Sequence, residues 1–290
     1  MASTLFNIYI NDITKIDNDS ISIYADDLLI QVSGNNIEQI NTYTNNILNK
    51  INEYCKLNKL NLNYKKCKYM NIKGRKRYNE DQIDITINGN KLEKVNNFKY
   101  LGITIDKELN WNEHVKNVVK NIQKFIPIFY NIRNFTNQKV CIQLYKSLVV
   151  SKINYGLEIY GNRDLTKIQR CADKILEIIS FNKNNKNVQK VKIENKILQI
   201  EDQKNILWIK LSHDIIYNSI NLPYYFKKLI ELKDNRNGLI INTKYRNSKY
   251  GDKLSYNIMQ SLWNNLNVNT RKIQDKLLFN DSITNYYLNK

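Results

Sequence analysis

Two adjacent carboxylates interrupt an apolar, strand-like stretch near the start of the chain. Within "SISIYADDLLIQVS", residues 20–33, Asp26 and Asp27 are flanked by isoleucines and leucines. Ionised neighbours repel, and burying either one without a partner costs several kcal/mol, so we expect a positive partner. Because adjacent strand residues point to opposite faces, both carboxylates can reach one partner only if the chain turns between Ile23 and Ile30. An ordinary exposed turn between two strands is the alternative.

The charge of the chain narrows the class of partner. The formal net charge is +18 over 290 residues, and the isoelectric point is near 9.5. Such a strongly basic balance favours a polyanion, either nucleic acid or an acidic membrane surface. A hydrophobic content of 42% is enough for real cores, so global disorder is not expected.

Membrane insertion and secretion are not indicated. No apolar run approaches the ~20 residues that span a bilayer, and no basic-then-apolar signal stands at the N-terminus. The cysteines are widely spaced and form no C-x-x-C pair, which argues against a zinc knuckle or a disulfide framework. They are Cys55, Cys67, Cys141 and Cys171. We expect an intracellular protein, nuclear or cytoplasmic, with reduced thiols and no membrane partner.

The first part of the chain mixes helical and strand patterns. Apolar residues at helical spacing predict an amphipathic helix over about residues 36–57. A strand is expected around residues 69–72. Alternating isoleucines before Asn88-Gly89 predict a hairpin, and "FKYLGITID" predicts another ribbon that ends at Asp106.

From Trp111 onward the apolar period becomes helical, and it continues to Ile179. Pro127 should kink or end the first of these helices. The segment "FNKNNKNVQK", residues 181–190, has almost no apolar content and is the predicted linker. Further helix-like stretches lie at residues 206–220 and 282–288.

Several motifs occur in one order along the chain. They are "LFNIYINDI", "YADD", "LNLNYKKCKYM", "FKYLGITID", "LNWNEH", "YGLEIYG" and "LWNNL". In this order and spacing they resemble the reverse transcriptase of non-LTR (LINE-type) retrotransposons. The resemblance implies an α+β fold: a partial right-hand polymerase palm of antiparallel strands with helices (1–110), followed by a helical thumb (111–180). The low apolar content then predicts a linker (181–192), and the helix-like stretches predict a helical C-terminal region (193–290).

The resemblance also implies roles for the hairpin residues. Asp26 and Asp27 would hold two magnesium (or manganese) ions, which together can stabilise the attacking and leaving oxygens of nucleotidyl transfer. Tyr24 would lie close to the primer end, and the small Ala25 would let substrate approach. Tyr24 could equally be an aromatic residue of an edge strand.

Lysines and a second hairpin complete the implied site. Lys66 matches the family's N-x-x-K lysine and could neutralise the departing pyrophosphate, or it could be one more lysine of a basic run. That run could bind nucleic-acid phosphates, serve as a nuclear localisation patch, or be a solvated loop. Its other cations are Lys65, Lys68, Lys73, Arg75, Lys76 and Arg77. Tyr100, Leu101 and Gly102 resemble the primer-gripping hairpin, with a bulged strand as the alternative.

The histidine of the "LNWNEH" motif is assigned no catalytic role. Trp111 and His114 match the family pattern L-x-W-x-x-H. A lone histidine at the start of a helix is usually a packed or capping group, and we expect that here.

The implied activity is that of an RNA-directed DNA polymerase, with an RNA template, a DNA primer and deoxynucleotides as partners. In the family, the fingers, a third palm aspartate and a nucleotide-binding Gln-Gly precede the position of "MASTLF". We therefore expect an N-terminally truncated fragment that is inactive alone. The alternatives are a catalytically silent, basic nucleic-acid-binding module and a non-functional relic.

Overall fold

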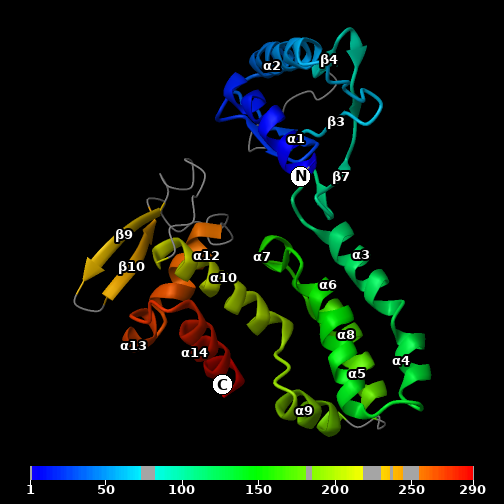
Figure 1. Ribbon diagram of the computed structural model, residues 1–290, viewed down its shortest axis with the longest axis vertical. Coiled ribbons are helices and arrows are strands. Elements are labelled where there is room, and N and C mark those ends of the chain that lie inside the picture. Colours follow the sequence, from blue (N-terminus) through cyan, green and yellow to red (C-terminus); the bar gives the residue numbers. More distant parts are fainter. Residues whose placement is uncertain are drawn as a thin grey trace. The chain divides into compact units, whose positions relative to one another are not determined.

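The protein combines many helices with small pairs of strands (Figure 1), as the sequence predicted. The computed structural model describes residues 2–72, 82–180, 185–217, 230–235, 238–243 and 255–289. Its contacts divide the chain into two compact units, Met1–Asn110 and Trp111–Lys290. The basic positions 73–77 and the predicted helix end at 218–220 lie outside the described residues.

The first unit places short strands around one long helix. Its elements are α1 (Ala2–Ile10), the 3-10 helix η1 (Asn11–Ile16), β1 (Ile21–Tyr24), β2 (Asp27–Ile30), α2 (Ile37–Leu57), β3 (Lys68–Tyr69), β4 (Thr86–Ile87), β5 (Asn90–Lys91), β6 (Glu93–Lys94), β7 (Asn97–Tyr100) and β8 (Ile103–Asp106). Three antiparallel hairpins form, β1–β2, β4–β5 and β7–β8. The β3–β6 pair is parallel, which departs from the expected antiparallel strands.

Helix α2 confirms the predicted amphipathic helix and organises this unit. The Asn36 side chain accepts a hydrogen bond from the Gln39 N–H (2.8 Å), which satisfies a donor of the first turn. The buried face of α2 contributes to two apolar clusters. Ile51 packs with the β1–β2 hairpin, and Leu48 packs with Ile85 and its neighbours before and within β4–β5. The two hairpins are therefore anchored to the same helix.

Two asparagines of α2 also hold the backbone that leads into β4. The Asn45 amide donates to the Asp84 carbonyl (3.0 Å), and its oxygen accepts from the Thr86 N–H (2.9 Å). One turn earlier, Asn41 donates to the Gln82 carbonyl (2.9 Å) and accepts from the Asp84 N–H (3.2 Å). Each side-chain amide thus pairs with one backbone donor and one backbone acceptor of residues 82–86, as a neighbouring strand would do in a sheet.

The second unit is mostly helical. Its elements are α3 (Asn112–Gln123), α4 (Ile126–Ile132), α5 (Gln138–Tyr145), the π-helix η3 (Lys146–Val150), α6 (Ser151–Asn154), α7 (Leu157–Tyr160), α8 (Thr166–Ile179), α9 (Asn185–Glu194), α10 (Ile200–Tyr217), β9 (Ile230–Asn235), β10 (Gly238–Thr243), α12 (Ser255–Asn264), α13 (Val268–Arg271) and α14 (Lys276–Leu288). The first predicted helix ends before Pro127, as expected. Pro127 then lies in the first turn of α4, where its missing N–H leaves no hydrogen bond unmade.

Helix α8 is the centre of the larger core of this unit. Ile168, Ile175 and Leu176 are fully buried on its inner face. They share one apolar cluster with side chains of α3, α4, α5, η3 and α9. A separate cluster joins α10, β10, α12 and α14 around Trp263 and Phe279.

The predicted linker at 181–190 is wrong from Asn185 onward, because α9 begins there. Val188 and Val191 are buried in the core beside α8. The Lys192 ammonium also pairs with the Asp173 carboxylate of α8 (2.6 Å). This polar helix is docked by two valines and one ion pair. Because it contains so few apolar residues, its sequence shows no helical periodicity.

The helical prediction for residues 193–290 is also incomplete. Strands β9 and β10 form an antiparallel hairpin in this region. Ile241 of β10 is fully buried, and the Asn264 side chain bonds both its N–H (3.0 Å) and its carbonyl (2.8 Å). A short apolar run cannot be distinguished from a helix segment by periodicity. Within the described part of the chain, no helix combines the length and apolarity needed to cross a bilayer.

Candidate functional site

The "YADD" stretch forms the tip of a two-stranded hairpin. Tyr24 pairs with Asp27 across a turn made of Ala25 and Asp26. Ala25 has φ +51°, the left-handed conformation that two-residue hairpin turns require. The predicted turn between Ile23 and Ile30 is thereby confirmed.

The hairpin is anchored at its base and open at its tip. Ile21 is 5% exposed and packs with Ile13 and Ile51. Asp26 and Asp27 are exposed, and the Tyr24 side chain is 65% exposed. The two carboxylates are therefore solvent-exposed at the tip of a hairpin whose base is packed in the core. Because they are not buried, no desolvation cost arises.

A second hairpin carries the "KYLG" residues. Tyr100 pairs with Ile103, and the turn residues Leu101 (φ +45°) and Gly102 (φ +81°) both lie in the left-handed region. Positive φ at both central residues is typical of the type I′ turn. Glycine adopts it without cost, whereas Leu101 is strained by about 1 kcal/mol. A strained leucine at a hairpin tip marks this turn as a functional candidate.

The charge of Asp27 in the first hairpin acts on Tyr100 of the second. Burial raises the pKa of Tyr100, and the negative charge of Asp27 raises it further. The phenol group therefore lies close enough to Asp27 to be affected by its charge. No local pattern links residues so far apart in the chain, so this electrostatic interaction was not predicted from the sequence.

Lys66 lies in a tight turn after α2. The Asn63 carbonyl accepts hydrogen bonds from the Lys66 N–H (3.0 Å) and the Cys67 N–H (3.3 Å), so the N-x-x-K residues span a β-turn. Lys66 is exposed, and no ion pair joins it to Asp26 or Asp27. Its role at the departing pyrophosphate stays a prediction.

The remaining cations of the basic run divide into two groups. Lys65 is exposed, as a phosphate contact requires. Lys68 instead forms an ion pair with Glu93 of β6, and its side chain is only 25% exposed. Lys73, Arg75, Lys76 and Arg77 lie outside the described residues.

His114 is a packed residue. It is 5% exposed, and its ring meets that of Tyr160 edge-on, with 4.7 Å between the centroids. Burial lowers the pKa of the imidazole, which favours the neutral form. Trp111 precedes it at the start of α3 with φ +60°. The expectation of a packing role is confirmed.

The donor atoms at the hairpin tip suit a hard cation. Asp26 and Asp27 offer carboxylate oxygens, which magnesium prefers, and exposure leaves room for the waters that it retains. In the regions that the structure describes, no group of three or more His, Cys, Asp or Glu side chains converges on a common point. Asp26 and Asp27 are therefore the candidate ligands for a magnesium or manganese ion at this tip.

Comparisons with known proteins agree with the motif pattern. Residues 1–105 match the family model described as "Reverse transcriptase (RNA-dependent DNA polymerase)". The chain is 24% identical over 194 residues to the RNA-directed DNA polymerase from mobile element jockey of Drosophila melanogaster. The resemblance to non-LTR retrotransposon reverse transcriptases is confirmed. The protein of the same name from Drosophila funebris is 25% identical over 166 residues.

The extent of these matches is limited. The jockey alignments cover 62% and 55% of this chain but only 21% and 18% of the relatives. The chain thus spans about a fifth of the length of the curated relatives it matches. No solved structure is significantly similar to it.

Proposed function

We propose that residues 1–110 are part of the palm of an RNA-directed DNA polymerase and that residues 111–180 are its thumb. The exposed Asp26–Asp27 pair, held at the tip of a hairpin inside the matched region, is the observation that carries this proposal. The partners would be an RNA template, a DNA primer and deoxynucleotides.

In this proposal Asp26 and Asp27 bind magnesium or manganese. When bound, the metal would supply positive charge to the oxygens of the reacting phosphoryl group. Tyr24, with its exposed ring, would contact the primer end, and Ala25 would leave space beside it. The turn Tyr100–Gly102 would hold the primer strand, and the effect of the Asp27 charge on Tyr100 supports this assignment.

The first prediction concerns catalysis by this chain alone. We expect no primer extension above background on an RNA template with magnesium and deoxynucleotides. Two adjacent carboxylates provide few ligands for two metal ions, and the described residues add no third side chain at the tip. Robust extension that Asp26→Ala abolishes would contradict this prediction and would indicate a complete active site.

The second prediction concerns the metal. Magnesium or manganese should raise the melting temperature, because a divalent cation relieves the repulsion between Asp26 and Asp27 and binds only the folded hairpin. At a free-metal concentration ten times the dissociation constant, the gain in unfolding free energy is about 1.4 kcal/mol. Differential scanning fluorimetry over a metal titration measures it.

The matched control is the double variant Asp26→Asn, Asp27→Asn. It removes the repulsion and the ligands together, so without metal it should be at least as stable as the parent. It should also lose the response to magnesium. An identical response in parent and variant would assign the stretch to an ordinary turn.

A basic nucleic-acid-binding module without catalysis is the second candidate. The net charge of +18 and the exposed Lys65 and Lys66 favour it. Phosphate binding by such cations does not need the metal hairpin, so this alternative predicts nucleic-acid binding that is unchanged in the variant Asp26→Asn, Asp27→Asn.

A further inference from the structure

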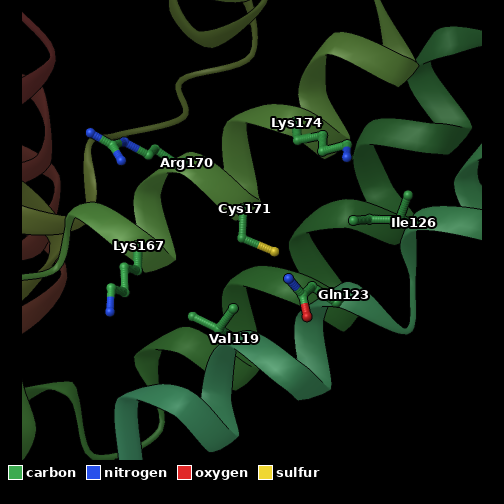
Figure 2. A pocket seen from close by; sticks show the side chains of 7 residues that line it. All are labelled: Val119, Gln123, Ile126, Lys167, Arg170, Cys171 and Lys174. Carbon is green, nitrogen blue, oxygen red and sulfur yellow. The ribbon is translucent and has the colours of Figure 1, made fainter. Parts of the chain in front are cut away.

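Helices α3, α4 and α8 enclose an open groove in the second unit. It has a volume of 370 Å³ and is lined by Val119, Gln123, Ile126, Lys167, Arg170, Cys171 and Lys174. Figure 2 shows the Cys171 thiol pointing toward Gln123 across the gap between the helices. No motif of the sequence analysis pointed to these residues.

One wall of the groove is cationic. Lys167, Arg170 and Lys174 follow one another at intervals of three and four residues along α8, which places them on one face of the helix. All three are exposed, and none is in an ion pair with a described residue. The charge of Asp164 interacts with Lys167 and Arg170, and the Asp164 carboxylate already accepts a hydrogen bond from the Thr166 N–H (2.9 Å). The wall keeps a net positive charge.

The floor of the groove is apolar and contains no aromatic ring. Val119 and Ile126 are partly buried side chains that pack against the core. Cys171 is 8% exposed, and burial raises the pKa of its thiol, which favours the uncharged form. The floor therefore suits aliphatic side chains.

We propose that this groove binds an acidic amphipathic helix of a partner protein. Carboxylates at intervals of three and four residues on a second helix repeat with the same rise as the cations of α8. Leucine-type side chains on the adjoining face would fill the apolar floor, as in other helix-in-groove complexes. Nucleic acid fits the groove less well: a duplex would contact only the cations and leave the apolar floor uncovered, and single-stranded bases bind by stacking on aromatic side chains, which the floor lacks. The proposal is independent of the proposed polymerase function.

Fluorescence anisotropy with the full chain tests it. The probe is a labelled synthetic helix with glutamates at intervals of three and four residues and leucines on the adjoining face. Charge reversal by Lys167→Glu, Arg170→Glu and Lys174→Glu should weaken binding by more than about tenfold. The matched triple variant reverses exposed lysines of the same unit that do not line the groove, Lys120, Lys139 and Lys152. It should weaken binding far less.

A second pair of variants separates a peptide from nucleic acid. Val119→Asn makes the floor polar, and Gln123→Glu adds a negative charge at an exposed position of the groove. Both variants should weaken binding of the peptide, whereas Val119→Asn should leave binding of a single-stranded oligonucleotide unchanged. Equal peptide binding by all groove variants would overturn the proposal. The proposal would also be overturned if an oligonucleotide displaced the peptide and if its binding were lost only on charge reversal. The occupant of the groove would then be nucleic acid.

Discussion

Binding of this chain to a random-sequence duplex should fall about a thousandfold when salt rises from about 50 to about 200 mM. The physical reason is counterion release: log affinity falls against log salt with a slope of about 0.9 per phosphate neutralised. The net charge of +18 makes about six phosphate contacts reasonable, and these give the stated change. Titrations by fluorescence anisotropy at several salt concentrations measure the slope.

The turn after α2 offers a matched pair of variants for this prediction. Lys65→Ala together with Lys66→Ala removes two exposed cations and should reduce the slope by about 2. Lys68→Ala should change it little, because Lys68 is already paired with Glu93. Affinity that does not depend on salt would exclude nucleic acid as the partner of this basic chain.

Asp173→Ala should lower the unfolding free energy by about 3 kcal/mol, because it leaves the Lys192 ammonium buried without its partner. The Lys192 side chain is 4% exposed, and it lies 2.6 Å from Asp173 and 3.4 Å from the Gln199 side-chain oxygen. Asp173 is 30% exposed and also accepts from Gln169 (2.8 Å). Its partial exposure places the cost at the low end for a buried pair. Urea denaturation followed by circular dichroism measures it.

Two controls show whether the buried charge is the cause. Lys192→Met should restore much of the stability when it is added to Asp173→Ala, because no unpaired charge then remains. Lys190→Met on the same helix breaks an exposed pair with Glu194 (3.8 Å) and should change stability by less than about 0.5 kcal/mol. Additive effects of the two substitutions at 173 and 192 would contradict a direct interaction.

The tertiary contacts of α9, including this ion pair, explain why its residues were predicted to be a linker. Residues 181–190 contain so few apolar side chains that no helical period is visible. Their helix is stabilised by Val188 and Val191 in the core of α8 and by the contact of Lys192 with Asp173. Most helical stability in proteins comes from such tertiary packing, which a local pattern does not contain.

The asparagines of α2 show the same limit in another form. Asn41 and Asn45 belong to a composition rich in asparagine, and nothing in their local pattern separates them from the others. Their four hydrogen bonds to residues 82–86 depend on where that backbone lies. Only the tertiary structure assigns them a role.

The sequence by itself determined those elements that depend only on residues close together in the chain. Apolar spacing predicted α2, and two adjacent carboxylates required the turn that the β1–β2 hairpin makes. The motif order identified the reverse transcriptase resemblance. The tertiary structure decided what depends on residues far apart in the chain. It docked α9 on α8 and set the cations of α8 beside the apolar side chains of α3 and α4. Sequence periodicity records which face of an element is apolar, but it does not record which distant element that face will meet.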